Sequence, residues 1–418
     1  MKMIRLGELA EVRISNVDKK SKPTESQVLL CNFTDVYNNW AITNSHLPHL
    51  MRATANNQQI DKFSLKKGDV AITKDSETRD DIGMSAYIAD DFSNVVLGYH
   101  CALIKPNSNL IDGKYLNAFL NTSTARKYFS NFASGSGQRY TLIDSSIKDI
   151  KIPLISLNEQ KKIGNVFSHI DAKIENNNSI IQTLEETART IYDYWFLQFE
   201  FPNEKGRPYK SSGGKMAWND ELKREIPEGW IAASIDSIAS MQFSSVMPVP
   251  RTNYFHYSIP AFDKSQMPVQ ESGESIQSNK YFVPENAILV SKLNPQFKRI
   301  WNVMNAEKNS ICSTEFIPFI PLNKGDQGYV FEVLNSDSFS QFMNQSSSSS
   351  TGSRKRMQPE SVHGFVMPIP PLAIQISYSK KIESMLGEIE NAKRENQWLL
   401  SLRNFVLPLL ISGQVKLG

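Results

Sequence analysis

The sequence predicts an α+β fold, in which two globular domains of mixed helix and strand are separated by two long helices that form an antiparallel coiled coil. The chain has 418 residues, more than one hydrophobic core usually organises, so two or more domains are expected. It repeats itself at an offset of 215 residues, and each copy ends in a long apolar heptad pattern. These observations predict an internal pseudo-two-fold repeat.

The internal repeat is clearest where GSGQRYTLIDSSIKDIKIPL is followed, 215 positions later, by STGSRKRMQPESVHGFVMPI. This offset pairs Gly137 with Gly352 and Pro153 with Pro368 without a gap. Further upstream, DVAITK resembles AILVSK, and LGELAE weakly matches IDSIAS. Each copy therefore contains short strands, a helix, a Gly/Ser loop with basic residues, and a proline-bounded start to a long helix.

The repeat and the turn residues divide the chain into five predicted segments. Runs rich in β-branched residues and bounded by turn residues, such as QVLLCNF, DVAIT, NAILVSK and EFIPFIPL, predict strands in both globular domains. The segments are a first domain at 1–150, a first helix at 151–200, a linker at 201–232, a second domain at 233–367 and a second helix at 368–418.

Both long helices carry apolar or small residues in alternating steps of four and three, which is the pattern of a coiled-coil seam. The predicted interface residues of the first helix are Ile163, Phe167, Ile170, Ile174, Asn177, Ile181 and Leu184. Those of the second helix are Ile382, Met385, Ile389, Asn396, Leu399 and Val406. A helix that only covers its own domain would show a similar pattern, but two related seams favour pairing with each other. An asparagine on such a seam often fixes the register.

Composition excludes several classes of protein. The net charge of +3 does not by itself indicate nucleic acid, so any DNA-binding face must consist of local basic clusters. No signal peptide and no run of about 18 apolar residues occurs, so we expect a soluble cytoplasmic protein without membrane contact. Cys31, Cys101 and Cys312 fit neither a disulfide framework nor a metal site and are predicted to be buried thiols. No metal site is predicted, because His46 and His49 lack a third ligand nearby.

Two stretches carry a resemblance to a known family. They are WFLQFEFPNEKGRPYKSSGGKMAWNDELKREIPEGW, around the linker, and IPLISLNEQKKI, at the start of the first helix. With the plan of two domains and two helices, they make the chain similar to the DNA specificity subunits of type I restriction-modification systems over essentially its whole length. The second helix start keeps the prolines and Gln375 but has Ile374 where the first copy has Glu159. The role of Glu159 is therefore open.

This resemblance implies a subunit without catalytic activity. Its two globular domains would be target recognition domains, each reading one half of a bipartite, asymmetric sequence in double-stranded DNA. Its helices would hold the domains apart and dock two methyltransferase subunits, and restriction/translocase subunits would complete the assembly. The resemblance implies no cofactor in this chain, since S-adenosylmethionine, ATP and Mg²⁺ would belong to the partner subunits.

The candidate DNA-binding residues fall into two groups in each half. The Gly/Ser loops suit contact with phosphates, because small side chains allow close approach and the basic residues supply charge. These candidates are Gly137, Gln138, Arg139, Gly352, Arg354, Lys355 and Arg356. Polar loop residues after β-rich segments suit base edges, since Arg pairs with guanine and Asn or Gln with adenine. These candidates are Lys74, Arg79, Lys292, Asn294, Gln296, Lys298 and Arg299. Ordinary surface charge is the alternative interpretation of both groups.

The main alternative function is a self-contained adenine DNA methyltransferase. NPQF at 294–297 resembles the Asn/Asp-Pro-Pro-aromatic motif that clamps a flipped base, but its third residue is glutamine. FASGSG lacks the spacing and the preceding strand of a cofactor loop, and no Walker A sequence occurs. No catalytic residue is therefore predicted. A purely structural coiled-coil protein is disfavoured by the two elaborate, non-identical domains.

Overall fold

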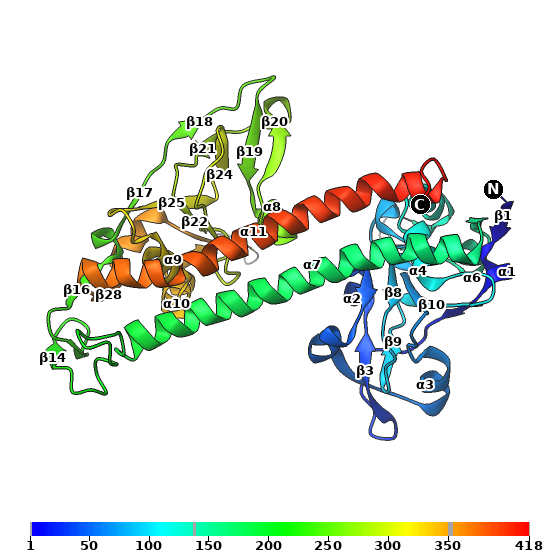
Figure 1. The fold of residues 1–418 in the computed structure, drawn as a ribbon, viewed down its shortest axis with the longest axis horizontal. Coiled ribbons are helices and arrows are strands. Elements are labelled where there is room, and N and C mark those ends of the chain that lie inside the picture. Colours follow the sequence, from blue (N-terminus) through cyan, green and yellow to red (C-terminus); the bar gives the residue numbers. More distant parts are fainter. Residues whose placement is uncertain (1, 137–138, 350–353, 418) are drawn as a thin grey trace. The chain divides into compact units, whose positions relative to one another are not determined.

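The chain folds into two compact units, each with a globular part and a stretch of both long helices (Figure 1). The computed structural model describes residues 2–136, 139–349 and 354–417. The first unit comprises Met1–Glu175 and Trp398–Gly418, and the second comprises Asn176–Gln397. In the part of the chain that the structure describes, no helix has both the length and the apolar character needed to cross a membrane.

The first unit is built on a five-stranded sheet with the strand order β2-β10-β6-β8-β4. These strands are β2 (Ala10–Ile14), β4 (Ala41–Ile42), β6 (Val70–Thr73), β8 (Ser85–Ile88) and β10 (Cys101–Pro106). Successive residues of a strand point to opposite faces. Accordingly, Val70 and Ile72 of β6 lie in the core beneath the helices, whereas Ala71 lies in the core on the other face. The central strands are therefore buried on both faces.

Helices cover one face of this sheet and a second sheet covers the other. The helices α4 (Gly113–Leu120) and α5 (Ser123–Phe132) bury Tyr115, Phe119 and Phe129 against the first face. The covering sheet has the order β5-β3-β9. The remaining elements are β1 (Lys2–Arg5), α1 (Leu6–Leu9), β3 (Ser26–Cys31), α2 (Phe33–Asn38), β5 (Met51–Ala55), α3 (Asn57–Phe63), β7 (Asp75–Ser76), β9 (Val95–Leu97), β11 (Ser134–Ser136), β12 (Arg139–Thr141), α6 (Asp144–Lys148) and β13 (Lys151–Leu154).

The second unit repeats this plan with one strand fewer in its central sheet. That sheet has the order β17-β25-β22-β23, and a five-stranded sheet, β18-β21-β24-β19-β20, accompanies it. The central strands are β17 (Ala239–Met241), β22 (Ile288–Ser291), β23 (Ile300–Asn302) and β25 (Phe316–Pro321). The other elements are β14 (Met216–Asn219), β15 (Arg224–Pro227), β16 (Ile231–Ser234), β18 (Ser245–Val246), β19 (Asn253–Tyr257), α8 (Ile259–Ser265), β20 (Val269–Ser272), β21 (Lys280–Phe282), β24 (Ser310–Ser313), α9 (Gln327–Asn335), α10 (Asp337–Gln345), β26 (Ser347–Ser349), β27 (Lys355–Met357) and β28 (Val366–Ile369).

The internal repeat predicted from the sequence is confirmed in the order of the elements. The strands β10 and β25 begin 215 residues apart, and so do β13 and β28 and the two long helices. In both units the strand before the long helix pairs antiparallel with an early strand of its unit, as β13 with β1 and β28 with β16. Both units mix helix and strand, so the α+β prediction is also confirmed.

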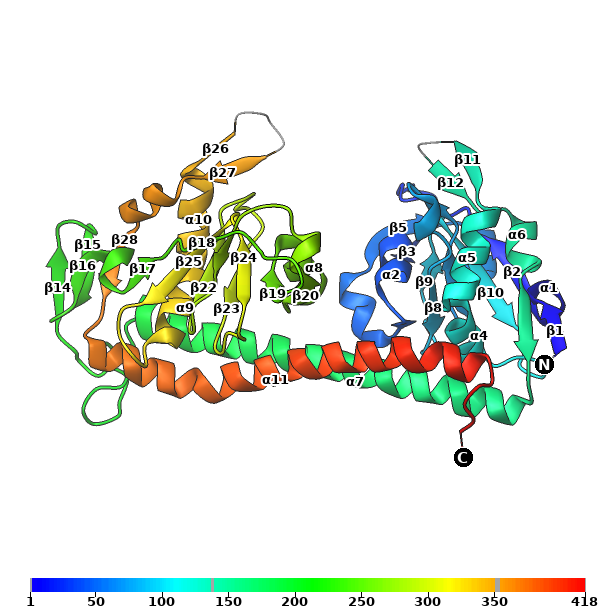
Figure 2. The same cartoon turned by 90° about the horizontal axis from the view of Figure 1, so that it is seen from above.

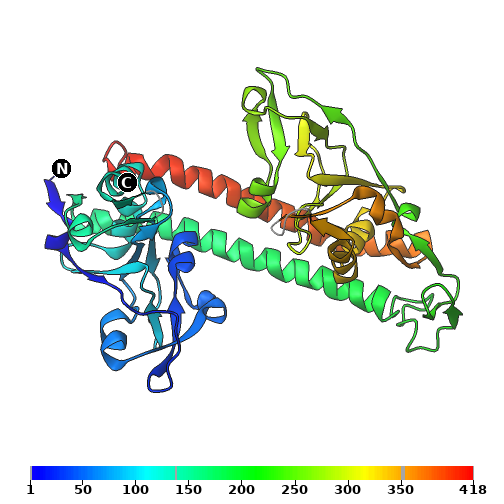
Figure 3. The ribbon, with the colours of Figure 1, turned by 180° about the vertical axis from the view of Figure 1, so that it is seen from behind.

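The long helices are α7 (Leu157–Tyr192) and α11 (Leu372–Ile411), and they lie side by side within each unit (Figures 1 and 3). In the second unit, the Asn177 side chain donates to Asn396 Oδ1 at 2.9 Å, and the Tyr378 hydroxyl donates to the Ala188 carbonyl at 2.9 Å. Residue numbers thus rise along α7 as they fall along α11. The antiparallel pairing predicted from the seams is confirmed.

The seam residues differ in burial along the pair. In the first unit, Ile163, Phe167, Ile170 and Leu399 are buried, and Ile174 and Val406 are partly buried. In the second unit, Asn177, Ile382 and Ile389 are buried, and Ile181 and Leu184 are partly buried. Met385 is only partly buried, and its neighbour Leu386 lies in the core. The three cysteines are buried free thiols, as predicted.

Candidate nucleic-acid interface

In the first unit, the fold joins the two groups of candidate residues into one surface. The hairpin of β11 and β12 projects beyond α5 and α6 (Figure 2). Its second strand pairs antiparallel with β7, the short strand that follows Lys74, with Thr141 opposite Asp75. The Leu142 amide also donates to the Lys74 carbonyl at 2.7 Å. The basic hairpin is therefore anchored to the loop after β6.

A buried carboxylate, Asp75, organises this surface. One carboxylate oxygen accepts from Lys74 Nζ at 2.9 Å and lies 2.8 Å from His100 Nδ1 and 3.1 Å from Arg139 Nη2. The other oxygen accepts from the Thr141 hydroxyl at 2.7 Å. Burial raises the pKa of Asp75, but the hydrogen bonds from His100, Lys74 and Thr141 outweigh it and hold the pKa at about 2. Arg139 and Lys74 are thus positioned by a fixed negative charge.

A cavity of about 560 Å³ lies beside this anchored hairpin. It is lined by Asp75, His100 and Arg139 together with the stacked pair Phe33 and Tyr37, whose ring centroids are 5.5 Å apart. Its size falls within the range of ordinary ligand pockets. The cavity is large enough to admit a planar ring.

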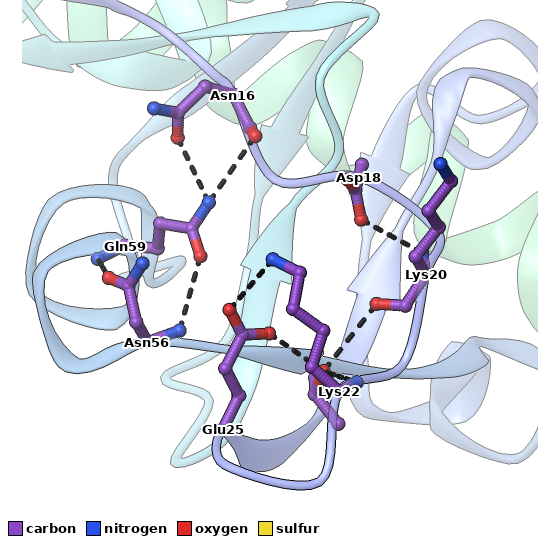
Figure 4. Close-up of polar contacts among 8 residues, drawn as sticks. Asn16, Asp18, Lys20, Lys22, Glu25, Asn56 and Gln59 are labelled. Atoms are coloured by element: carbon purple, nitrogen blue, oxygen red, sulfur yellow. Dashed lines mark hydrogen bonds and ion pairs between the residues drawn. The ribbon is translucent and has the colours of Figure 1, made fainter.

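Lys19 also lines this cavity, from the loop between β2 and β3. Polar contacts fix that loop on both sides of Lys19 (Figure 4). The Asp18 carboxylate accepts from the Lys20 amide at 2.9 Å, and Lys22 Nζ donates to Glu25 at 3.0 Å. Gln59 donates to the Asn16 carbonyl at 3.3 Å. This loop therefore places a second basic residue, Lys19, in the lining of the cavity.

The second unit contains the same arrangement, built from different residues. The hairpin of β26 and β27 projects beyond α10 (Figure 2). The Met357 amide donates to the Lys292 carbonyl at 3.0 Å, the counterpart of the bond between Leu142 and Lys74. The backbone N–H of Asn294 donates to the Lys355 carbonyl at 2.8 Å, and the side-chain Oδ1 of Asn294 accepts from the backbone N–H of Lys355 at 3.0 Å. In both units, the loop after the central strand is thus joined to a basic hairpin.

The anchoring carboxylate of the second unit is Glu315. It accepts from Arg356 Nε at 3.1 Å, and its carbonyl accepts from the Lys292 amide at 2.9 Å. Glu315 occupies the place of His100 at the offset of 215, and the His100 carbonyl likewise accepts from the Lys74 amide at 2.9 Å. The two units use the same backbone frame but present different side chains.

The remaining candidates divide into exposed and ion-paired side chains. Arg79, Gln296, Arg354 and Lys355 are exposed, and the guanidinium of Arg79 lies over the ring of Tyr140 at 5.1 Å. Two other candidates hold the globular part of the unit together. Lys298 donates to the Asn335 carbonyl and to Asp337, at 2.8 and 2.9 Å. Arg299 forms two bonds to Asp263, at 2.6 and 2.9 Å. Gly137, Gln138 and Gly352 lie outside the described residues.

Sequence reasoning did not identify the three anchoring residues Asp75, His100 and Glu315. His100 and Glu315 are related by the 215-residue offset, which is the signal that could have indicated both. Asp75 carries no such signal, because Leu293 takes its place opposite the second hairpin. Its role becomes visible only when β7 and β12 are paired.

Comparisons with known proteins show which proteins this chain resembles. Residues 1–186 match the family model described as Type I restriction modification DNA specificity domain. The MjaIX type I restriction enzyme specificity subunit of Methanocaldococcus jannaschii is 31% identical over 147 residues, which are 35% of this chain and 32% of that relative. The HindI specificity subunit of Haemophilus influenzae is 21% identical over 412 residues, covering 85% of this chain and 88% of that protein. The first 186 residues thus match the specificity-domain model, and the chain is similar to type I specificity subunits.

The fold agrees with this assignment. The solved type I restriction-modification S subunit from M. genitalium is similar over 98% of this chain and 95% of its own, with a TM-score of 0.53 and 15% identity. The resemblance noted in the sequence is confirmed by the family model and the curated relatives, and the solved structure supports the fold. The curated relatives are named as specificity subunits of type I restriction enzymes, and nothing favours the alternative of a self-contained methyltransferase.

Proposed function

We propose that this specificity subunit reads a bipartite, asymmetric double-stranded DNA target, one half with each unit. The observation that carries the proposal is the duplicated joint between the loop after the central strand and the basic hairpin. In each unit a backbone hydrogen bond closes this joint, at Leu142 to Lys74 and at Met357 to Lys292. Different anchoring side chains on one frame suit two different half-sites.

The hairpins and the loops make different kinds of contact with DNA. Phosphate contacts position a protein on DNA, whereas contacts to base edges distinguish sequences. We assign the phosphate contacts to the hairpins, where Arg354 and Lys355 are exposed. We assign base contacts to the loops, where Arg79 and Gln296 are exposed at corresponding places after β6 and β22. Arg79 suits guanine and Gln296 suits adenine.

The partners proposed for this chain follow from its family. Two methyltransferase subunits dock on the paired helices, and restriction/translocase subunits join the same cytoplasmic complex. S-adenosylmethionine, ATP and Mg²⁺ are then ligands of those partners. In this division of labour, the specificity subunit selects the site and the partners perform the chemistry.

The salt dependence of DNA binding tests the hairpin contacts. We expect Lys355→Ala to weaken binding of the intact chain to specific and non-specific duplexes alike. Affinity decreases with salt concentration, so a plot of their logarithms has a negative slope. This slope should become less steep by about one, because one phosphate contact is lost. Fluorescence anisotropy over a salt series measures both effects.

The matched control for this experiment is Lys324→Ala. Lys324 is exposed in the same unit, after the end of β25, whereas Glu315 at the other end of β25 contacts the hairpin. The control should leave affinity and slope unchanged. An unchanged slope for Lys355→Ala, or equal losses in both variants, would contradict the assignment of phosphate contacts to the hairpin.

A further inference from the structure

The two units differ at one edge of the central sheet. In the first unit, β4 covers the outer edge of β8, and it belongs to the twelve-residue connection 39–50 between α2 and β5. In the second unit, only residues 266–268 connect the corresponding elements, α8 and β20. No described strand pairs with the outer edge of β23, the counterpart of β8. The second unit therefore lacks the segment that closes this edge.

In the first unit, the closing segment is held by backbone and ring contacts. The Tyr87 amide donates to the Trp40 carbonyl at 2.9 Å, and the Ala89 amide donates to the Ile42 carbonyl at 3.0 Å. The Trp40 ring lies 4.6 Å from the Arg403 guanidinium of α11. These contacts describe an added parallel strand with an aromatic anchor.

A carboxylate on the helix pair completes this attachment. Glu175 of α7 accepts from the Thr43 hydroxyl at 2.6 Å and also from the Ser45 hydroxyl. At the offset of 215, the counterpart of Glu175 is Glu390 of α11. The counterpart of Arg403, which contacts the Trp40 ring, is Ala188 of α7. Both counterparts line a cavity in the second unit.

That cavity has a volume of about 330 Å³ and lies against the uncovered edge of β23. The Val303 amide donates to the Ala287 carbonyl of the neighbouring chain segment at 2.8 Å, so strand alternation turns the Asn302 amide toward the outer edge. Trp301 also lines the cavity and is only 5% exposed, yet its Nε1 finds no acceptor among the described residues. The Trp301 indole N–H thus lacks an acceptor among the described residues, and the Asn302 amide faces the side on which an added strand would lie.

We propose that this cavity binds a short extended segment of a partner subunit, which adds a strand beside β23 and inserts an aromatic side chain. The carbonyls of the segment complement the donors at Asn302 and Trp301, and a serine or threonine of the segment complements the Glu390 carboxylate. Addition of a strand to an open sheet edge is a common mode of peptide recognition. The existence of a partner subunit rests on the proposed function, whereas the open edge does not.

The first unit supplies the probe for this proposal, a synthetic peptide of residues 39–46, NWAITNSH. We expect the fluorescein-labelled peptide to bind the intact chain saturably, with an affinity reduced about tenfold or more by Glu390→Ala. Replacing the tryptophan of the peptide by alanine should weaken binding similarly. The control is Glu388→Ala, an exposed glutamate of α11 outside the cavity, which should have no effect.

Hydrogen exchange provides the second measurement, on the complex with the methyltransferase subunit. The amides of residues 300–305 should exchange more slowly in the complex than in the isolated chain, and Glu390→Ala should reduce this protection. Absence of saturable peptide binding, or unchanged exchange in the complex, would overturn the proposal. DNA affinity of the isolated Glu390→Ala chain should equal that of the wild type, so a failure of DNA recognition is distinguishable from a failure of docking.

Discussion

At the first turn of α7, Ser156 and Glu159 satisfy each other's backbone amides, each side chain accepting from the other residue's N–H at 3.3 Å. This capping box gives Glu159 a role in starting the first helix. Ile374 occupies its place in α11 and cannot do the same. The shared feature is the glutamine that follows, since Gln160 and Gln375 each donate to a carbonyl five residues earlier, at 2.9 and 2.8 Å.

The buried Glu332 in the second unit should make the stability of this unit depend on pH. Burial raises the pKa of Glu332 to about 7, although the nearby Arg189 partly offsets the effect. Between pH 4.5, the ordinary pKa of a glutamate, and about pH 7, the folded state holds a proton that the unfolded state has lost. The free energy of unfolding therefore falls as the pH rises through this window and is level above it.

The Glu332→Gln substitution should abolish this decrease in the free energy of unfolding, because a glutamine side chain does not ionise. We expect the variant to match the wild type near pH 4.5 and to be more stable at pH 8, by up to about 3 kcal/mol. Urea unfolding across the pH range measures the difference. Glu388→Gln, at an exposed position, serves as the control and should change nothing. A stability difference that is constant with pH would show that the folded and unfolded states bind the same number of protons at Glu332, and it would contradict the prediction.

At the scale of the elements, the paired asparagines of α7 and α11 predict an energetic coupling. Asn177 is 2% exposed and donates to Asn396 at 2.9 Å. We expect Asn177→Leu and Asn396→Leu each to destabilise the second unit by about 0.5–1.5 kcal/mol, because each removes the hydrogen bond between the two side chains. The double variant should recover part of this loss, with a coupling on the order of 1 kcal/mol.

Denaturant unfolding of the four proteins in this cycle measures the coupling. Asn176→Leu, at an exposed neighbouring position, should shift stability by no more than about 0.5 kcal/mol. If the destabilisation of the double variant equals the sum of the two single destabilisations, the two asparagines have no energetic coupling and the prediction is wrong.

The elements that sequence reasoning predicted are those with local signals. The long helices follow from the heptad pattern, and β6 and β22 follow from the β-branched runs DVAIT and NAILVSK. The two-residue strand β4 was not predicted, because its two residues have no periodicity and depend on the partner β8. The anchoring of the hairpin by Asp75 depends on pairing between residues more than 60 positions apart. Such contacts are set by topology and leave no local pattern.

At the scale of the whole molecule, the first unit requires residues from both ends of the chain. Leu399, Leu407 and Leu410 of α11 share its core with Ile163 and Phe167 of α7. We expect a chain that ends at Gln397 to lose the fold of its first unit and to keep that of its second. Burial of one large apolar side chain contributes about 1.5–3 kcal/mol, so losing several removes most of a domain's stability.

Hydrogen exchange measures whether each unit is folded in this truncated chain, because β6 belongs to the first unit and β22 to the second. A chain that ends at Ser412 is the matched control, because residues 413–417 are exposed. It should protect both strands as the full chain does. Equal protection of β6 in the chain that ends at Gln397 would show that the part of α11 after Gln397 is dispensable for the first unit.

Sequencing of methylated sites shows whether each unit reads its own half of the target. Cells would express the chain, or its Arg79→Ala or Gln296→Ala variant, with the methyltransferase partner. We predict that Arg79→Ala alters or relaxes one half-site only and that Gln296→Ala alters or relaxes only the other, since the two residues lie in different units. If either substitution changed both half-sites, or if the double variant left both unchanged, the account would be contradicted.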